Sequence, residues 1–512
     1  MAVQHAMRTA EDVTALTSWH SDWSGLRAVV LGLGITGFSV ADTLTELGAT
    51  VLVLASRADD ERADLLDVLG VSLVVADLET VGVRELAEFG PDLVVVSPGF
   101  APSHPILAAA AERGVPVWGD VELAWRLRDK LPTPAEWLTV TGTNGKTTTV
   151  QLATAMIAAG GKRVAACGNV GVPVLDAIRD PLGFDALVVE LSSFQLHYSR
   201  SVSAHSSVCL NVAADHLDWH GSPAAYSAAK ARVYEGTRVA CLFNRDDDAT
   251  RAMVENAEVV EGCRAIGFGL ALPGPSDLGL VDDILCDRAF IDDRHTNALE
   301  ITTMGQLREI GLGAPHMVAN VLAASAIARS FGIRADSIRA ALREFRVDRH
   351  RTEVVAERDR VCWIDDSKAT NPHAAGASIS AFESIVWVVG GLLKGVDVDH
   401  LIEIHAARFR AVVVIGVDRT EVIAAFARHA PGLPVFEVET TDTDEVMPTA
   451  VRLSATVAQP GDVVLLAPAA ASMDQFDDYA DRGRRFAEAV REMLGGRPDD
   501  DEHPQAATPP GS

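Results

Sequence analysis

Short apolar runs alternate with helix-like stretches along almost the whole chain, and this alternation restricts the fold more than any other feature. Examples of the apolar runs are Thr50–Ala55, Leu93–Val96 and Ile385–Gly390. Strands that are separated by helices pair in parallel, because a parallel neighbour is reached only through a long crossover connection. The pattern therefore predicts an α/β protein with parallel sheets, and the 512 residues suggest three domains of roughly 150 residues each.

The alternation falls into three blocks. A proline-rich segment at 131–134 separates the first block from the second, and the third opens at a predicted strand, Val361–Asp365. Residues 263–312 are rich in Gly and Asp and predict a β-containing excursion within the second block. The predicted divisions are an N-terminal extension (1–23), a first domain (24–132), a central domain (133–347), a third domain (348–496) and a disordered tail (497–512).

The composition excludes several classes of partner. The net charge is -27, from 71 acidic and 44 basic side chains, so we expect neither nucleic acid nor an anionic membrane as a partner. The six cysteines form no Cys-x-x-Cys pair, which indicates reduced core thiols in a cytoplasmic protein. No apolar stretch reaches about 18 residues, and residues 1–23 lack an apolar signal core, so we expect neither export nor membrane insertion.

Lysine is rare in this chain, which has six lysines and 38 arginines. Four of the six lie in short motifs, at Lys146, Lys230, Lys368 and Lys394. Arginine stays protonated, whereas a lysine amine can lose its proton and react. A codon bias that leaves lysines at random is the alternative, but it does not explain why four of the six lie in motifs. The sequence therefore predicts that lysine is retained for chemistry.

A first glycine-rich loop, Gly-Leu-Gly-Ile-Thr-Gly at 32–37, lies between a predicted strand and a predicted helix. Such a loop lets a phosphate approach the backbone at a helix N-terminus. The next strand ends in Ala55 and Ser56, where a dinucleotide-binding protein normally carries an acidic residue. The loop therefore indicates a diphosphate rather than NAD, with a plain turn as the alternative. The candidate binding residues are Gly34, Ile35, Thr36, Gly37 and Ser56.

A second loop, Thr-Gly-Thr-Asn-Gly-Lys-Thr-Thr at 141–148, gives a stronger signal. Its backbone amides can cradle phosphates, Lys146 can reach the β- and γ-phosphates, and the Thr147 hydroxyl can bind Mg²⁺. It departs from the common Walker spacing, because Val140 stands at the position of the first glycine. The candidate ATP-binding residues in this loop are Gly142, Thr143, Asn144, Gly145, Lys146, Thr147 and Thr148.

Two predicted strands of the central block end in polar residues. Glu190 ends one strand, and Asp215, His216 and Asp218 follow the next. The carboxyl ends of parallel strands meet at one edge of a sheet, and oxygen-rich ligand sets suit Mg²⁺ better than Zn²⁺. The pattern predicts a magnesium site beside the phosphate loop.

The third block carries two further candidate anion sites. Asp366, Lys368 and Thr370 follow a predicted strand and precede a helix. Ser472 and Gln475 are expected at the start of a last helix that spans residues 475–494. Helix capping alone is the alternative for these residues.

In their order along the chain, these motifs resemble the Mur ligases of peptidoglycan synthesis. The phosphate loop marks the whole family, whereas Glu-Leu-Ser-Ser-Phe-Gln at 190–195 and Asp-Ser-Lys-Ala-Thr-Asn at 366–371 resemble the members that add D-glutamate. Further matches are Ser-Pro-Gly at 97–99, Gly-Asn-Val-Gly at 168–171, Asp-His-Leu-Asp at 215–218, Tyr-Ser-Ala-Ala-Lys at 226–230, His-Arg at 350–351 and Ala-Ser-Met-Asp-Gln-Phe at 471–476.

The resemblance implies three α/β domains, of which the first is Rossmann-like, the central one is P-loop ATPase-like and the third is Rossmann-like. It also implies an ATP-dependent ligase that adds D-glutamate to UDP-N-acetylmuramoyl-L-alanine through an acyl phosphate. The implied cofactors are ATP and Mg²⁺ at two sites, with Lys230 carbamylated by CO₂. The implied partners are these small molecules alone, and the chain is expected to be a monomer.

The resemblance also assigns roles to individual residues. The catalytic residues would be Lys146, Glu190, His216 and Lys230, and the metal ligands Thr147, Glu190, His216 and Lys230. Asn169, Ser192 and Gln195 would bind the UDP-sugar together with the first glycine loop. Asn320, Arg351, Asp366 and Lys368 would bind ATP, and Thr370, Lys394, Ser472 and Tyr479 would bind D-glutamate.

Three residues depart from the family pattern, and three alternative functions stay open. Ala55 and Ser56 replace an acidic residue that reads uracil in relatives, Met317 replaces a polar residue near adenine, and Tyr479 replaces a phenylalanine. One alternative is an NAD(P)-dependent oxidoreductase. Another is a Mur-type or folylpolyglutamate-type ligase that uses a different amino acid. The third is a non-catalytic scaffold that binds UDP-sugars.

Overall fold

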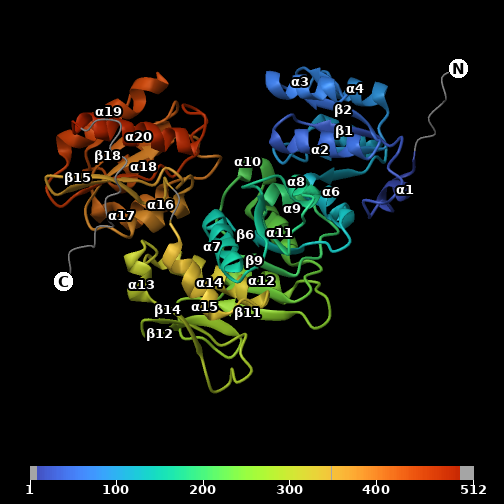
Figure 1. Cartoon of the computed structure of the whole chain (residues 1–512). Helices are drawn as coiled ribbons and strands as arrows, with labels where there is room; N and C mark the ends of the chain where they lie inside the picture. Colours follow the sequence, from blue (N-terminus) through green and yellow to red (C-terminus); the bar gives the residue numbers. More distant parts are fainter. Residues whose placement is uncertain (1–7, 347–348, 496–512) are drawn as a thin grey trace. The chain divides into compact units, whose positions relative to one another are not determined.

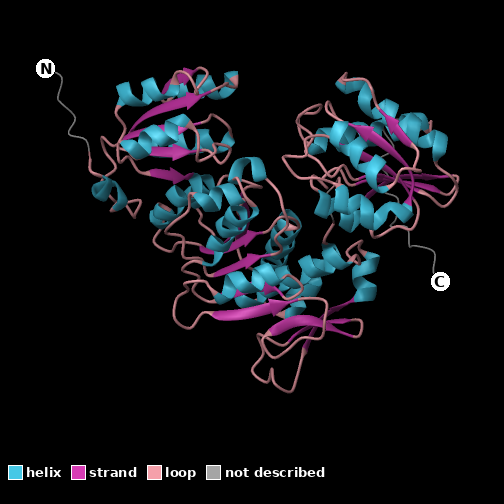
Figure 2. Cartoon of the chain, turned by 180° about the vertical axis from the view of Figure 1, so that it is seen from behind, coloured by secondary structure: helices cyan, strands magenta, loops and turns pink. Residues whose placement is uncertain are grey.

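A computed structural model describes residues 8–346 and 349–495, and Figure 1 shows its helices and strands. The described strands form three separate sheets of five, nine and six strands. Helices flank the strands of each sheet in Figure 2. Three such sheets confirm the predicted three-domain α/β architecture. The predicted tail, 497–512, lies outside the described residues.

The described residues form two compact units. The first unit contains the residues up to Val212 together with 224–304 and 319–345, and it holds the five-stranded and nine-stranded sheets. The second unit contains 213–223, 305–318 and the described residues from Arg346 onward, with the six-stranded sheet. The domain boundaries drawn from the sequence stay predictions, and the one between the central and third domains falls at 347–348, outside the described residues.

The first sheet has the strand order β3-β2-β1-β4-β5, and all of its strands are parallel. This order is that of a dinucleotide-binding fold, so the predicted Rossmann-like topology is present. The strands are β1 (Arg27–Leu31), β2 (Thr50–Ala55), β3 (Ser72–Val75), β4 (Leu93–Val96) and β5 (Val117–Gly119). The helices are α2 (Ile35–Glu46), α3 (Asp60–Val68), α4 (Gly82–Phe89), α5 (Pro105–Glu112) and α6 (Asp120–Arg126).

The described part of the N-terminal extension belongs to the first core. Helix α1 (Ala10–Thr14) begins after Thr9, whose side chain accepts a hydrogen bond from the N–H of Asp12. Val13 and Trp23 are buried in the same apolar cluster as strand β1. Arg126 of α6 donates from Nη1 to the carbonyl oxygen of Thr14 at 2.8 Å. These contacts fasten the extension to the first domain.

The central sheet has the order β14-β13-β12-β11-β10-β9-β6-β8-β7. Strands β6 to β12 pair in parallel with their neighbours, whereas β13 pairs antiparallel with both β12 and β14. Strands β12, β13 and β14 lie in the predicted excursion. The strands are β6 (Glu136–Thr141), β7 (Val164–Gly168), β8 (Ala186–Glu190), β9 (Ser206–Cys209), β10 (Ala240–Asn244), β11 (Arg264–Phe268), β12 (Asp277–Val281), β13 (Ile284–Asp287) and β14 (Leu299–Thr303). The helices of this part of the chain are α7 (Lys146–Ala159), α8 (Val174–Arg179), α9 (Ser193–His197), α10 (Leu217–His220), α11 (Pro223–Ala231), α12 (Asp248–Glu255), α13 (Met304–Glu309), α14 (Pro315–Ser330) and α15 (Ala335–Glu344). Of these, α10 and most of α13 belong to the second unit.

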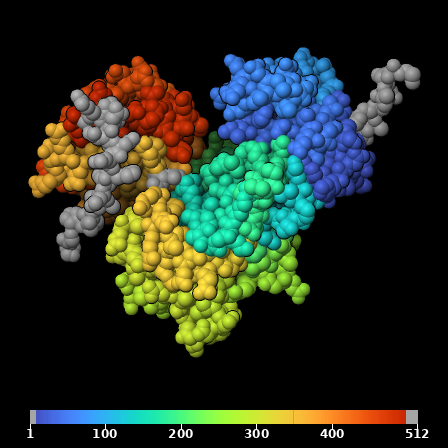
Figure 3. Space-filling view, viewed as in Figure 1, coloured from blue at the N-terminus to red at the C-terminus, as the bar shows by residue number. Residues whose placement is uncertain are grey.

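The first and central domains contact each other within the first unit. Glu122 of α6 is buried and accepts hydrogen bonds from the N–H groups of Arg200 and Ser201 at 2.7 and 2.9 Å. Arg179 of α8 donates to Asp42 of α2 at 2.6 Å. In Figure 3 the blue first domain lies directly against the cyan part of the central domain. The two candidate phosphate loops are therefore carried by one compact unit.

The third sheet has the order β15-β16-β20-β17-β18-β19, in which only the edge strand β15 is antiparallel to its neighbour. The strands are β15 (Glu353–Arg358), β16 (Val361–Asp365), β17 (Ile385–Gly390), β18 (Phe409–Ile415), β19 (Val435–Glu437) and β20 (Val463–Leu466). The helices are α16 (Pro372–Ile379), α17 (Asp399–His405), α18 (Thr420–His429), α19 (Thr443–Val457) and α20 (Tyr479–Met493).

One element of this domain differs from the prediction. The last helix begins at Tyr479 rather than at Gln475, because Asp478 is its N-cap and accepts from the N–H of Asp481. Ser472 and Gln475 therefore lie in the loop between β20 and α20 and do not cap that helix. Among the described residues, no helix is both long and apolar enough to cross a membrane.

Candidate active site

The phosphate loop connects the buried strand β6 to helix α7. Gly142 and Gly145 have φ values of 152° and 82°, which L side chains rarely adopt. A Cβ atom on Gly145 would lie 2.4 Å from Oδ1 of Asn320, so glycine is required there for space as well. The structure thus places Asn320 of α14, a predicted ATP residue, directly against the loop.

Two lysines converge on this loop. Lys146 Nζ donates to the carbonyl oxygens of Gly142 and Thr143, both at 2.9 Å. Lys230 Nζ, on α11, also donates to the Gly142 oxygen, at 2.8 Å, and lies 4.7 Å from the ring centroid of Tyr226. The Lys230 side chain is only 1% exposed. The fold therefore brings together two lysines that lie far apart in the sequence and are both predicted to be catalytic.

Glu190, at the end of β8, is buried beside the loop that follows β7. Its Oε1 accepts from Nδ2 of Asn169 at 2.9 Å, whereas its Oε2 is buried and has no hydrogen-bond partner among the described residues. Gly168 has a φ of 101° and permits this close approach, because a Cβ there would lie 2.4 Å from the Glu190 carbonyl oxygen. A buried carboxylate oxygen without a partner is costly. A divalent cation would satisfy Oε2, so Glu190 fits the predicted role of metal ligand.

Gln195 and Ser192 form a capping box at the start of α9. The Gln195 Oε1 atom accepts from the Ser192 N–H at 3.1 Å, and its Nε2 donates to Oδ2 of Asp120 at 3.0 Å. Burial raises the pKa of the Asp120 carboxyl to about 6. Asp120 was not predicted as a site residue, although its position directly after the short strand β5 could have indicated it. Hydrogen bonds within the protein thus fix both the oxygen and the nitrogen of the Gln195 side-chain amide.

The first glycine loop connects β1 to α2. Gly32 has a φ of 94°, and a Cβ on Gly37 would lie 2.0 Å from the Gly32 carbonyl oxygen, so both glycines are required for the turn. The N-cap of α2 is Gly34, which offers no side-chain cap to the free N–H groups. Ser56 is exposed just after β2. The loop has the geometry of a diphosphate site, and no basic side chain belongs to it.

In the second unit, the residues after β16 form a compact polar group. Asp366 accepts from the N–H of Thr352 at 3.1 Å and from the hydroxyl of Ser378. Burial raises the pKa of the Asp366 carboxyl to about 6. Lys368 Nζ donates to the hydroxyl of Tyr479 at 3.0 Å. A predicted ATP residue and a predicted D-glutamate residue therefore touch within one domain.

The same unit brings Lys394 close to the segment that carries His216. Lys394 Nζ lies 3.7 Å from Oδ1 of Asp215, and Asn371 Nδ2 lies 3.4 Å from its Oδ2. His216 adopts a left-handed conformation with φ 52°, and Lys394 does so with φ 55°. Strained backbone of this kind is concentrated at functional sites. The contact with Asp215 places Lys394, a predicted D-glutamate residue, beside the segment that carries a predicted metal ligand.

Arg482 is a fully buried residue that the sequence analysis did not select. Its guanidinium donates to the carbonyl oxygen of Ser367 at 2.9 Å, to the Ser367 hydroxyl at 3.0 Å and to the Ala470 oxygen at 3.1 Å. Burial lowers the pKa of Arg482 to about 9. Arg482 therefore joins the loop after β16 to the loop after β20, which carries Ser472.

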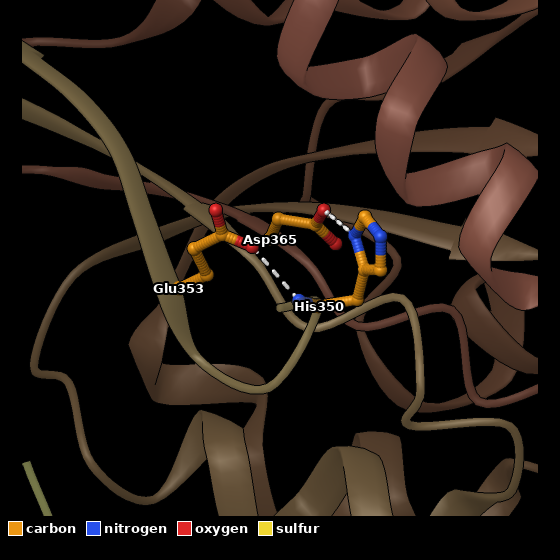
Figure 4. Close-up of side chains that lie close together, drawn as sticks. All are labelled: His350, Glu353 and Asp365. Atoms are coloured by element: carbon orange, nitrogen blue, oxygen red, sulfur yellow. Dashed lines mark hydrogen bonds and ion pairs between the residues drawn. The ribbon is translucent and has the colours of Figure 1, made fainter. Parts of the chain in front are cut away.

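A second acidic group lies near the start of β15 and is drawn in Figure 4. His350 Nδ1 lies 2.6 Å from Oδ2 of Asp365, and the His350 N–H donates to Oε2 of Glu353 at 2.8 Å. The other Asp365 oxygen accepts from the Ser367 N–H at 2.9 Å. His350, Glu353 and Asp365 lie close enough to share an ion, but hydrogen bonds already satisfy both Asp365 oxygens. This group serves to fix the loops.

Comparison with known proteins gives matches along the whole chain. Family models described as Mur ligase MurD-like N-terminal domain, Mur ligase middle domain and Mur ligase glutamate ligase domain match 26–119, 140–328 and 350–470. The UDP-N-acetylmuramoylalanine--D-glutamate ligase of Leifsonia xyli subsp. xyli is 63% identical over 98% of this chain and 99% of that protein. Its namesake in Streptomyces avermitilis is 52% identical over 92% of this chain and 99% of that protein.

A solved structure shares the fold at much lower sequence identity. The UDP-N-acetylmuramate-alanine ligase of Thermotoga maritima superposes with a TM-score of 0.53 at 20% identity, covering 91% of this chain and all of that one. The similarity supports the three-domain architecture described above.

Proposed function

Because this chain belongs to the Mur ligase family, we propose that it joins D-glutamate to UDP-N-acetylmuramoyl-L-alanine, with conversion of ATP to ADP and phosphate. The observation that carries this proposal is the 63% identity, over 98% of the chain, to a ligase named for that reaction. Its product is a precursor of peptidoglycan. We place the reaction in the cytoplasm and expect a monomer to carry it out.

The reaction would proceed in two steps. First, a carboxylate oxygen of the L-alanine residue attacks the γ-phosphorus of ATP, so that ADP leaves and an acyl phosphate forms. The D-glutamate amine then attacks the acyl carbon, and the tetrahedral intermediate collapses to the amide and phosphate. Phosphoryl transfer requires mainly positioning and charge neutralisation. The loop around Gly142 and the ammonium of Lys146 are suited to both tasks.

The phosphate loop and the residues near it would bind ATP. Lys146 donates to two carbonyl oxygens of the loop. When ATP binds, its charged phosphate oxygens would become the acceptors instead, and such charge-assisted hydrogen bonds are stronger. The N–H groups at the start of α7, which no side chain caps, would face the same phosphates. The remaining ATP residues would be Gly142, Thr143, Asn144, Gly145, Thr147, Thr148, Asn320, Arg351, Asp366 and Lys368.

Glu190 would hold Mg²⁺ through its buried Oε2, together with Thr147, His216 and Lys230 in two sites. When bound, the metal would neutralise charge on the phosphate oxygens. As a carbamate, Lys230 would combine its amine with CO₂, release a proton and present two anionic oxygens. Its remaining N–H could still donate to the Gly142 oxygen, the contact that it makes now. A guanidinium cannot undergo this reaction, which supports the presence of lysine at this position.

The UDP-sugar and D-glutamate would bind to different parts of the chain. The UDP-sugar would lie on the first glycine loop, at Gly34, Ile35, Thr36 and Gly37, with Ser56 near the base. Asn169, Ser192 and Gln195 would contact its sugar part. D-Glutamate would be bound by Thr370, Lys394, Ser472 and Tyr479, where Lys394 supplies the charge for a carboxylate.

Phosphate release tests this proposal. Purified protein is given ATP, Mg²⁺ and UDP-N-acetylmuramoyl-L-alanine, and then D-glutamate, L-glutamate or meso-diaminopimelate in separate reactions. We expect phosphate release that requires both the UDP-sugar and D-glutamate. Release with a different amino acid would reject D-glutamate as the substrate and favour another Mur-type or folylpolyglutamate-type ligase. No release with any acceptor, despite ATP binding, would favour a scaffold.

A further inference from the structure

Two cysteines lie side by side on neighbouring strands of the central sheet. Cys241 is in β10 and Cys263 immediately precedes β11, and their Sγ atoms are 3.8 Å apart. The N–H of Arg264 donates to the oxygen of Val239, so Cys263 faces Val239, two residues before Cys241. Side chains two residues apart point to the same face of a sheet. The two thiols therefore meet on one face without any change of register.

The two thiols differ in access and in acidity. Cys241 is 2% exposed, whereas Cys263 is partly exposed at the edge of the same apolar cluster. The two sulfur atoms share a hydrogen bond in which either thiol can be the donor, and this contact lowers the pKa of Cys263 and raises that of Cys241. The more accessible sulfur is thus the one that favours the thiolate, which is the reactive form of cysteine.

The other four cysteines lack this combination. Burial raises the pKa of Cys209 and of Cys362 to about 11. It also raises the pKa of Cys167 and of Cys286. Among the described residues, none of these four thiols forms a hydrogen bond with another sulfur atom, unlike Cys241 and Cys263.

We propose that Cys241 and Cys263 form a reversible disulfide when the protein meets a low-molecular-weight disulfide. The Cys263 thiolate attacks one sulfur of the small disulfide and expels a small thiolate, which leaves a mixed disulfide on Cys263. The Cys241 thiol then loses its proton and attacks the Cys263 sulfur, which expels the second small thiolate. The protein loses two hydrogen atoms, and the small disulfide is reduced to two thiols.

The bond requires a local adjustment of the chain just before β11, because Cys263 lies two positions before Ala265, the residue that pairs with Cys241. A disulfide places its sulfur atoms about 2 Å apart, so the two Sγ atoms must approach by roughly 2 Å. The bond would close a loop that contains helix α12 and would tie β10 to β11. Cross-linking restricts the unfolded chain, so the oxidised protein should unfold at a higher temperature than the reduced protein. Neither cysteine belongs to the proposed active site, so this inference does not depend on the proposed function.

The test treats the native protein with oxidised glutathione and then blocks the remaining thiols. Before blocking, we expect an intact mass lower by two hydrogen atoms. After blocking and digestion, we expect a cross-linked peptide pair that contains Cys241 and Cys263, with full recovery of both thiols on reduction. A Cys241→Ser variant should instead retain one glutathione on Cys263, and a Cys362→Ser variant should behave like the wild type. A wild-type protein that keeps glutathione on Cys263, or six free thiols after treatment, would overturn the proposal. So would the same mass loss in Cys263→Ser.

Discussion

The acidic groups around Glu190 and around Asp365 differ in how their oxygens are satisfied. Glu190 keeps a buried Oε2 without a hydrogen-bond partner among the described residues. Asp365 uses both oxygens, one toward His350 and one toward the Ser367 N–H. The Asp365 group contains more clustered carboxylate and imidazole groups, whereas the Glu190 group contains the unsatisfied buried oxygen. We therefore expect the cation at Glu190 rather than at Asp365.

The largest expected effect comes from a matched pair of Glu→Gln changes. Glu190→Gln removes the charge that would hold the metal, so we expect a loss of phosphate release of about 1000-fold, or roughly 4 kcal/mol of transition-state stabilisation. Glu353→Gln changes the same atoms in the hydrogen-bonded group, and we expect activity within a few-fold of the wild type. Comparable losses in the two variants, at matched folding by circular dichroism, would contradict the comparison.

Lys230→Ala should lose activity by about 100-fold, because the anion formed by carbamylation is missing. Added formate or acetate should restore part of the activity by supplying a carboxylate at the same place. Lys230→Arg is the control, since a guanidinium cannot be carbamylated, and a carboxylate should not restore it. Near-normal turnover of Lys230→Ala would exclude the carbamate.

Asp365→Asn should act mainly on stability. The change weakens hydrogen bonds to His350 and Ser367 in a buried site, and such charged hydrogen bonds contribute about 2 kcal/mol each. We expect a lower unfolding midpoint in urea with an unchanged slope. Glu190→Gln should leave the midpoint unchanged or raise it, since the charged oxygen has no partner to lose. A midpoint that falls further in Glu190→Gln than in Asp365→Asn would reverse the assignment of the two groups.

The smallest effect concerns Asp120 and pH. Burial raises the pKa of this carboxyl to about 6, so the folded state holds its proton more tightly than the unfolded state does. Its contribution to stability is complete below about pH 4 and is lost as the pH rises through about 6. Relative to Asp120→Asn, the wild type should therefore lose roughly 2 kcal/mol of unfolding free energy between about pH 4 and pH 7.

Denaturant unfolding at several pH values measures this difference. Asp22→Asn is the control, because hydrogen bonds from Ser24 lower the pKa of that exposed carboxyl and its pH dependence has the opposite sign. A difference in unfolding free energy between wild type and Asp120→Asn that stays the same at all pH values would contradict the expectation.

The sequence predicted the three α/β domains and most strands because parallel strands are short apolar runs that their flanking residues delimit. It located the start of α20 wrongly, because Asp478 caps that helix and the earlier Ser472 and Gln475 only resemble caps. It also missed Asp120 and Arg482. Their partners lie 75 and 115 residues away in the chain, and no local pattern marks such contacts. Whether the carboxylate oxygens of Glu190 and Asp365 have hydrogen-bond partners likewise depends on the folded structure and cannot be predicted from local sequence.

The most direct test of the account is the transfer of a labelled oxygen. UDP-N-acetylmuramoyl-L-alanine is prepared with ¹⁸O in its terminal carboxylate and incubated with the protein, ATP, Mg²⁺ and D-glutamate. An acyl phosphate transfers one carboxylate oxygen to phosphorus, so we predict one ¹⁸O atom in each phosphate released and one in the new amide. Phosphate without the label, or label in AMP, would contradict the proposed reaction.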